Sequence, residues 1–255
     1  MIEFTKMQQE IKELILDTPP PGKHCARSAI HHIEKAWEIK DIDREMAGFR
    51  ALTGEEESVT AIFHSLQRRR YCGASELKHR NHVHKAAMYP FLIAVSQAFA
   101  PVASEMKPTL VLRNESDQNR FRIRITMKGP NGEEMWAFPE PPLNFSVTLN
   151  GVIPDFAVQF SSLASEKNSK DIIAAIRAAA NLRNQILYAS EKGVPSLSEP
   201  LDKYLLKRRD VIFINLAIYL LIDPYNENQL FVQQALAAFL RMLNIIKDIN
   251  SILDW

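Results

Sequence analysis

The residues best suited to chemistry are the histidines, and all 7 lie within the first 84 positions. The densest group is the run Lys78-His-Arg-Asn-His-Val-His-Lys85. On a helix, residues three and four apart share a face, which pairs Arg80 with His84. An arginine can hold a phosphodiester through two hydrogen bonds, and an imidazole exchanges a proton near neutral pH. We therefore expect metal-independent RNA cleavage. Arg80 would bind phosphate, Asn81 would orient the site, and His82 or His84 would do the acid–base work.

Acidic side chains that could support this chemistry lie earlier, in the run Glu55-Glu-Glu57. A carboxylate beside an imidazole raises its pKa and holds its tautomer. We expect Glu56 or Glu57 to hold Arg80 or a histidine in this way. Glu57 and His64 are seven residues apart, which places them on one face of a helix. Charges that favour the start of a helix are the alternative interpretation of the run.

Basic residues surround the histidines and also follow one expected strand. From Arg68 to Lys85 the chain has six lysines and arginines and one acid, Glu76, which leaves a local charge of +5. Such a surface attracts a polyanion, although a solvated charged face is the commoner meaning of this pattern. No aromatic residue shares the strand face of these arginines, so base stacking on them is not indicated. The residues expected to contact RNA are Arg68, Arg69, Arg70, Lys78, Lys85, Arg120, Arg122 and Arg124.

Helical spacing of apolar residues predicts helices up to about residue 106. Thr5 is a candidate N-cap, and the run Asp17-Thr-Pro-Pro-Pro-Gly22 ends the first helix. Two interpretations remain open from 41 to 71. Either Thr53 caps a new helix through a capping box, or one long helix tolerates Gly54 at a cost of about 1 kcal/mol. A later helix is expected over Ser75–Tyr89, kinked at Pro90 before it continues to Pro101.

The pattern becomes strand-like after Lys107-Pro108. Apolar residues alternate with arginines over Arg120–Thr126, a period of two, and Gly129-Pro-Asn-Gly132 is a turn signal. These features predict an antiparallel sheet of three to five strands. Further strands are expected over 135–138, 144–149 and 156–160.

Helices return near Ser169. The first, ending at Gly193, contains Arg183-Asn-Gln-Ile-Leu-Tyr188, an echo of the Arg-Asn pair that is best explained by an ion pair on a buried helix. The next opens at Pro200 and ends at Asp223, with Lys207-Arg-Arg209 as its exposed edge. Its apolar run Val211–Ile222 spans only about 18 Å, too short for a bilayer, so we expect a buried helix. The last helix is expected over Glu227–Leu253.

Composition sets the broad class. The 255 residues are 46% hydrophobic and 24% charged, with a net charge of +1, an ordinary globular mix. The 8 glycines speak against a glycine-fingerprint nucleotide fold, and the 2 cysteines, Cys25 and Cys72, form no zinc or disulfide pattern. The first ten residues lack the apolar stretch of a signal peptide. We expect reduced thiols, no cofactor, no metal and a cytoplasmic location.

A family resemblance adds to this interpretation. The segment Phe49-Arg-Ala-Leu-Thr-Gly-Glu-Glu-Glu57, then an apolar helix, then His84-Lys85 about 27 residues later, resembles the HEPN superfamily, abortive-infection type. The resemblance covers about residues 28–99 and implies a dimeric helical bundle with metal-independent endoribonuclease activity in phage defence or a toxin–antitoxin module. The family pattern places four to six residues between its arginine and histidine, whereas three separate Arg80 from His84.

The expected fold is mainly α, a helical bundle with a small antiparallel β-sheet insertion near residues 109–160. We divide the chain into an N-terminal helical region (1–106), a β insertion (107–165) and C-terminal helices (166–255) that pack on the bundle or on a dimer partner. The expected function is a HEPN-like endoribonuclease that acts on RNA as a homodimer, with an antitoxin or defence-system partner and no membrane. The alternatives are a non-catalytic interaction or RNA-binding protein, adaptor or antitoxin-like, and a metal-dependent enzyme using His79, His82 and a glutamate.

Overall fold

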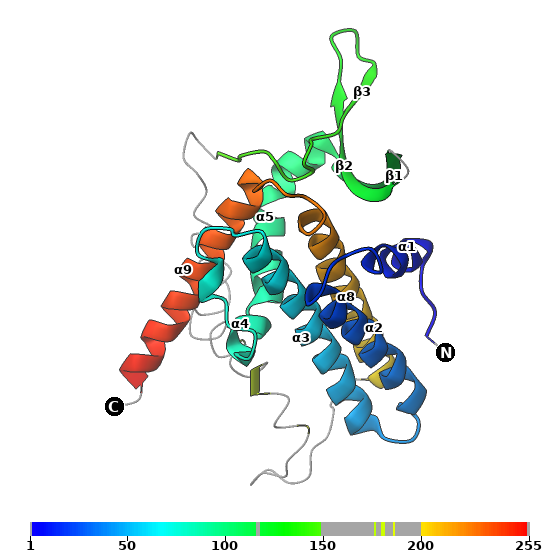
Figure 1. Ribbon diagram of the computed structural model, residues 1–255, viewed down its shortest axis with the longest axis vertical. Helices are drawn as coiled ribbons and strands as arrows, with labels where there is room; N and C mark the ends of the chain where they lie inside the picture. Colours follow the sequence, from blue (N-terminus) through cyan, green and yellow to red (C-terminus); the bar gives the residue numbers. More distant parts are fainter. Residues whose placement is uncertain are drawn as a thin grey trace.

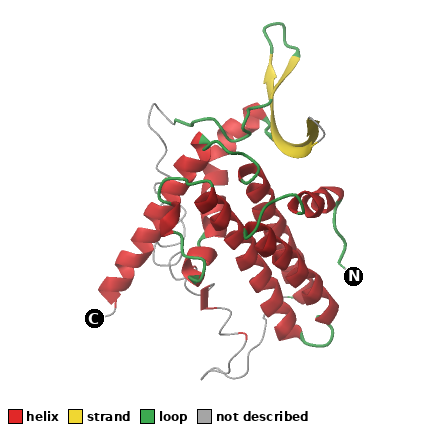
Figure 2. Ribbon diagram, in the orientation of Figure 1, coloured by secondary structure: helices red, strands yellow, loops and turns green. Residues whose placement is uncertain are grey.

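Long helices make up most of the protein in a computed structural model, and a small antiparallel sheet projects at one end (Figures 1 and 2). The structure describes residues 2–115, 118–148, 176, 180, 181, 186 and 200–253. The predicted fold class, mainly α with a small antiparallel sheet, is confirmed.

The first helix begins where the sequence predicts. At the start of α1 (Lys6–Ile15), the hydroxyl of Thr5 accepts a hydrogen bond from the N–H of Gln8, whose side chain accepts one from the N–H of Thr5. This is a capping box, which satisfies two donors that a helix start leaves unpaired. After the proline-rich break comes α2 (Gly22–Ile39), which buries a face of alanine and isoleucine residues in the core.

The central helix, α3 (Arg44–Arg68), is uninterrupted, so the long-helix interpretation is right and the capping box at Thr53 is wrong. The helix is capped by Asp43, whose side chain accepts a hydrogen bond from a backbone N–H of the first turn. Gly54 lets α3 approach α2, because a Cβ there would lie 2.9 Å from the carbonyl oxygen of Ala29. The glycine serves close packing and does not end a helix.

The helix expected over Ser75–Tyr89 is wrong. Its place is taken by the 3-10 turn η1 (Ala74–Glu76), an irregular stretch over 77–81 and the short helix α4 (His82–Ala86). From α3, the side-chain amide of Gln67 donates to two carbonyls of η1 and the stretch after it. Those carbonyls are therefore satisfied without a helix.

Helix α5 (Met88–Met106) follows directly. The two helices meet at Ala87, which is the C-cap of α4 and the N-cap of α5, and no interruption occurs at Pro90. Pro90 lies in the first turn of α5, where a missing N–H costs no helical hydrogen bond. The helix also passes through Pro101, where the sequence analysis expected it to stop.

Three antiparallel strands follow in the order β1 (Thr109–Glu115), β2 (Gln118–Lys128) and β3 (Glu134–Ala137). The period-two alternation and the turn at Gly132, which has a φ of +83°, are as predicted. Phe121 on β2 is buried in the core, so the sheet is anchored to the helices by its central strand.

Residues 144–148, expected as a strand, run along the last helix without regular pairing. The N–H groups of Leu143 and Val147 donate to the side chains of Gln229 and Gln234. Glutamine side chains thus replace the partner strand. The strand expected over 156–160 and nearly all of the helix expected over 169–193, including Arg183 and Tyr188, lie outside the described residues.

The C-terminal pair consists of α8 (Leu201–Ile222), which opens after Pro200 and ends at Asp223 as predicted, and α9 (Leu230–Leu253). α3 packs against both α2 and α8, and most of the apolar run of α8 is buried, as expected. By length and composition alone, α9 is apolar enough over Leu230–Lys247 to cross a membrane, a test that the core helix of a soluble protein also passes.

Candidate functional site

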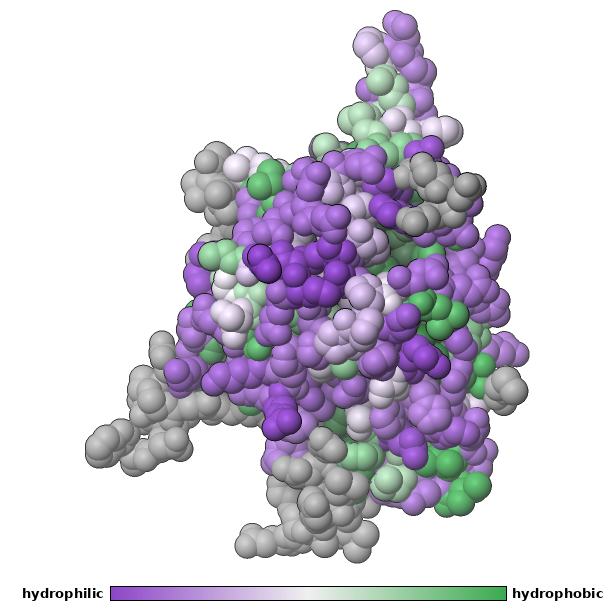
Figure 3. All heavy atoms as spheres, in the orientation of Figure 1, coloured by the Kyte–Doolittle hydropathy of each residue, from purple (hydrophilic) through white to green (hydrophobic). Residues whose placement is uncertain are grey.

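The predicted catalytic residues lie around α4, but they do not share one helical face. Arg80 is exposed and lies in the irregular stretch before the helix, so its predicted pairing with His84 on one turn is wrong. His82 and His84 are two residues apart in α4, which turns their side chains about 200° from each other. Figure 3 shows that the face carrying α3 and the turn after it is mostly hydrophilic.

Asn81 is the N-cap of α4. Its Oδ1 accepts hydrogen bonds from the N–H groups of Val83, at 2.9 Å, and His84, at 3.3 Å. This oxygen is therefore committed to the backbone. Asn81 therefore fixes the start of α4, which carries His82 and His84.

His82 faces the bundle and contacts Glu56 on α3. Its Nδ1 lies 2.7 Å from Oε1 of Glu56, and the Nζ of Lys85 lies 2.8 Å from Oε2 of the same carboxylate. The His82 side chain is 38% exposed, whereas Glu56 and Lys85 are 8% and 7% exposed. An ionised carboxylate only accepts hydrogen bonds, so Nδ1 donates to it, which in the neutral ring leaves the lone pair on Nε2. Lys85, predicted to contact RNA, is instead a buried partner of Glu56.

His84 faces the other way. Its Nδ1 accepts a hydrogen bond of 3.3 Å from the N–H of Lys78, which leaves the proton of the neutral ring on Nε2. Burial, and then the charge of Lys78, hold the pKa of His84 below its usual range. The imidazole lines a groove of about 400 Å³ between this stretch and α9, together with Lys78, Asn244 and Lys247.

The neighbouring acids have other partners. Glu55 is buried and forms an ion pair with Arg208 of α8, which the sequence analysis expected at an exposed edge. Burial, and then the nearby carboxylate of Glu57, raise the pKa of the Cys25 thiol to about 11. Glu57 and His64 share a face of the continuous helix α3, as predicted, but they lie two turns apart, about 10.5 Å along the axis, so they do not pair.

His64 stacks on His79, with ring centroids 4.1 Å apart. Burial lowers the pKa of both imidazoles. Within the described residues, no three His, Cys, Asp or Glu side chains gather as a metal site. The metal-dependent alternative, with His79 and His82, therefore has no ligand set in that part of the chain.

Two arginines of the run after α3 are structural. Arg68 donates to Oδ1 of Asp223 at 2.6 Å and to the Asp223 carbonyl at 2.8 Å. Arg69 donates to the same carbonyl and to Asn226. Both arginines thus satisfy groups at the end of α8, which limits the phosphate contacts predicted for them. Arg70 is exposed and has a φ of 57°.

The strand arginines do not form one open row. Arg122 is 3% exposed and forms an ion pair of 2.6 Å with Glu140. Arg120 lies over the ring of Tyr225, and Arg124 lies over that of Trp136. These rings come from other segments of the chain, so the strand pattern alone does not show that the arginines have aromatic neighbours.

The ion pairs of Glu55 with Arg208 and of Glu56 with Lys85 were not predicted from the sequence. Once α3 is one uninterrupted helix, Glu55 and Glu56 lie in its middle among buried residues and must meet cations. That signal indicates cationic partners but does not identify them; the fold supplies Arg208 and Lys85.

No family model, curated protein or solved structure matches this chain.

Proposed function

We propose that the chain is a metal-independent endoribonuclease in which His82 is the general base. The observation that carries the proposal is the 2.7 Å contact between Glu56 Oε1 and Nδ1 of a partly exposed imidazole. This contact leaves Nε2 as a proton acceptor and stabilises the imidazolium once it forms. Lys85, on the other oxygen, holds the Glu56 carboxylate in place within the bundle.

The chemistry needs only groups of the chain and the RNA. Nε2 of His82 takes the proton of a ribose 2′-hydroxyl, and the oxygen attacks the adjacent phosphorus. The bond to the 5′-oxygen breaks, and that oxygen takes a proton from water. The products are a 2′,3′-cyclic phosphate and a 5′-hydroxyl, and His82 then returns its proton to solvent.

We assign phosphate binding to exposed residues of the irregular stretch that precedes α4. Arg80 and Lys78 are exposed, and Lys78 shares the groove with Lys247 and His84. The neutral His84 ring has its N–H on Nε2, which suits it to donate a hydrogen bond to a phosphate oxygen. An RNA strand crossing the start of α4 would meet these donors and then His82. The HEPN resemblance suggests a homodimer that acts in bacterial defence or a toxin module.

A second candidate function is a non-catalytic interaction or RNA-binding protein. It is favoured by the projecting hairpin of β2 and β3, whose exposed apolar side chains are of the kind that contact partners. These are Met127, Met135, Trp136 and Phe138.

The test is incubation of the full chain with total RNA in EDTA. Cleavage into products with 2′,3′-cyclic phosphate ends is expected. His82→Ala should lower the rate by about 10²-fold or more, the usual contribution of a positioned base. The matched control is His24→Ala, which removes an exposed histidine of α2 and should leave the rate unchanged.

The outcomes separate the candidates. Retained cleavage in folded His82→Ala would refute the assigned base. Binding of RNA without cleavage by the unmodified chain would favour the RNA-binding alternative, and neither binding nor cleavage would favour an adaptor. Circular dichroism establishes that each variant is folded.

A further inference from the structure

The strand register places an exposed tryptophan on the arginine face of the sheet. Trp136 of β3 is directly opposite Thr126 of β2, so it lies on the same face as Arg124, two residues before Thr126. Trp136 is 59% exposed. Figure 1 shows that the hairpin of β2 and β3 stands clear of the helices. A large aromatic ring left to solvent on a projecting hairpin is the kind of side chain that contacts a partner.

Two exposed rings of this face each have an arginine over them. Cζ of Arg124 lies 5.4 Å from the centroid of the Trp136 ring, and Cζ of Arg113, on β1, lies 4.4 Å from that of Phe138. Both distances are within the range of a cation–π contact. Such a contact holds the ring in one orientation, which lowers the entropy cost of stacking a further planar group on its exposed part.

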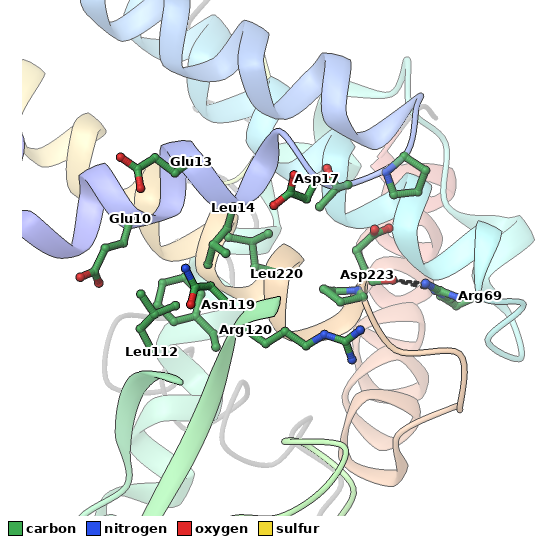
Figure 4. Close-up of a pocket in the computed structure, with 14 residues that line it drawn as sticks. Glu10, Glu13, Leu14, Asp17, Arg69, Leu112, Asn119, Arg120, Leu220 and Asp223 are labelled. Atoms are coloured by element: carbon green, nitrogen blue, oxygen red, sulfur yellow. Dashed lines mark hydrogen bonds between the residues drawn. The ribbon is translucent and has the colours of Figure 1, made fainter. Parts of the chain in front are cut away.

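The inner arginines of β2 are directed at the protein and are not part of this surface. Figure 4 shows Arg120 extending from the strand toward the end of α8, where it lines a cavity of about 730 Å³ together with Asp223. Arg122 is buried and forms an ion pair with Glu140. In contrast, no carboxylate among the described residues forms an ion pair with Arg124, which lies over Trp136. The positive charge of Arg124 is therefore available to a phosphate.

The two faces of the hairpin differ, and the difference indicates the kind of partner. Met127 and Met135 are opposite each other on the face away from Trp136. Lys128 is exposed on the Trp136 face, with Glu134 opposite it. Exposed rings among cations are typical of surfaces that bind single-stranded nucleic acid, because the rings stack on bases and the cations contact phosphates. Methionine side chains, by contrast, are suited to contacts with protein.

We propose that the arginine face of the hairpin binds single-stranded RNA, with a base stacked on Trp136 and a phosphate on Arg124. The choice of RNA as the ligand rests on the proposed function. A single strand is required, because its bases can be splayed out and stacked on a side chain. Helix α5 joins α4 to the sheet and has 19 residues, so it is about 28 Å long. The surface would thus hold a part of the strand remote from His82.

The test is fluorescence anisotropy of a labelled 2′-O-methyl RNA strand of about ten nucleotides, titrated with the full chain. This strand has no free 2′-hydroxyl, so it resists the proposed cleavage and binding is measured alone. Saturable binding is expected, and Trp136→Ala should weaken it roughly tenfold, the effect of losing one stacked base. Trp136→Tyr keeps a ring and should retain most of the affinity. The matched control, Met135→Ala, removes a side chain that is 46% exposed on the opposite face and should change the affinity less than twofold.

Three results would overturn the proposal. The first is no saturable binding of the single strand, which would leave the hairpin to a protein partner. The others are equal weakening by Trp136→Ala and Met135→Ala, and equal affinity of the unmodified chain for the duplex formed with a complementary strand. Because the strand cannot be cleaved, failure of the assay that tests His82 as the general base would leave this binding test unaffected.

Discussion

Two basic stretches, Arg68–Arg70 and Lys78–Lys85, are close in sequence and similar in charge, yet the fold uses them differently. In the first, Arg68 and Arg69 donate to Asp223 and are largely committed to the protein. In the second, Lys78 and Arg80 are exposed beside the histidines. A run of cationic residues can therefore bind a ligand only where its side chains are not already bonded to other groups of the protein.

The difference follows from what the local backbone needs. The end of α8 leaves carbonyl groups without helical partners, and the arginines supply donors to one of them, at Asp223. Around α4, uncharged side chains do this work, because Asn81 caps the helix and Gln67 bonds the turn before it. The cations of the second stretch are thereby left to solvent, with the exception of Lys85.

The largest loss of stability is expected when Lys85 loses its partner. Glu56→Ala leaves Lys85 buried without its carboxylate and should lower the free energy of unfolding by about 3–5 kcal/mol. The measurement is denaturant unfolding at pH 7. Adding Lys85→Met should restore much of the loss, and an unaltered midpoint in Glu56→Ala would contradict the buried pair.

The first stretch should respond to loss of its partner. Asp223→Ala removes the acceptor of Arg68 at Oδ1 and should lower the free energy of unfolding by about 2–3 kcal/mol. In contrast, Lys78→Ala should change it by less than about 0.5 kcal/mol, as exposed substitutions do. Equal changes in the free energy of unfolding of the two variants, by the same assay, would contradict the difference between the two stretches.

Acid should destabilise the packing around the second stretch, where His64 of α3 stacks on His79. Burial lowers the folded-state pKa of His64, His79 and His84 below the ordinary value of 6.5. Below that pH the unfolded chain binds more protons, so the stability is full above pH 6.5 and falls as the pH drops toward the folded-state pKa values. The melting temperature should therefore decline from pH 7.5 to pH 5. The decline should be smaller in His64→Gln and unchanged in His24→Ala.

The smallest effect concerns RNA affinity. Lys78→Ala or Lys247→Ala should each reduce the slope of log affinity against log salt by about one, as for the loss of one phosphate contact. Arg68→Ala should leave the slope unaltered, because Arg68 bonds to Asp223. A slope that falls in Arg68→Ala and not in Lys78→Ala would reverse the assigned roles.

Local chemistry was sufficient to predict several elements. The cap at Thr5, the end of α8 before Pro224 and the strand alternation with its turn at Gly132 each depend on bonding within a few residues. The same approach failed over Ser75–Tyr89, because side chains of α3 satisfy the turn there. The sequence could suggest that a glutamate contacts a histidine, but it could not say which glutamate contacts which histidine.

The helical class, the position of the sheet and the histidines available for acid–base chemistry can all be inferred from the amino-acid sequence. The contacts of Glu56 with His82, of Glu55 with Arg208 and of Arg68 with Asp223 depend on the fold. These contacts join residues that are far apart along the chain. These pairs are separated by 26 to more than 150 residues, so the packing of α3 against its neighbours, and no local pattern, selects each partner.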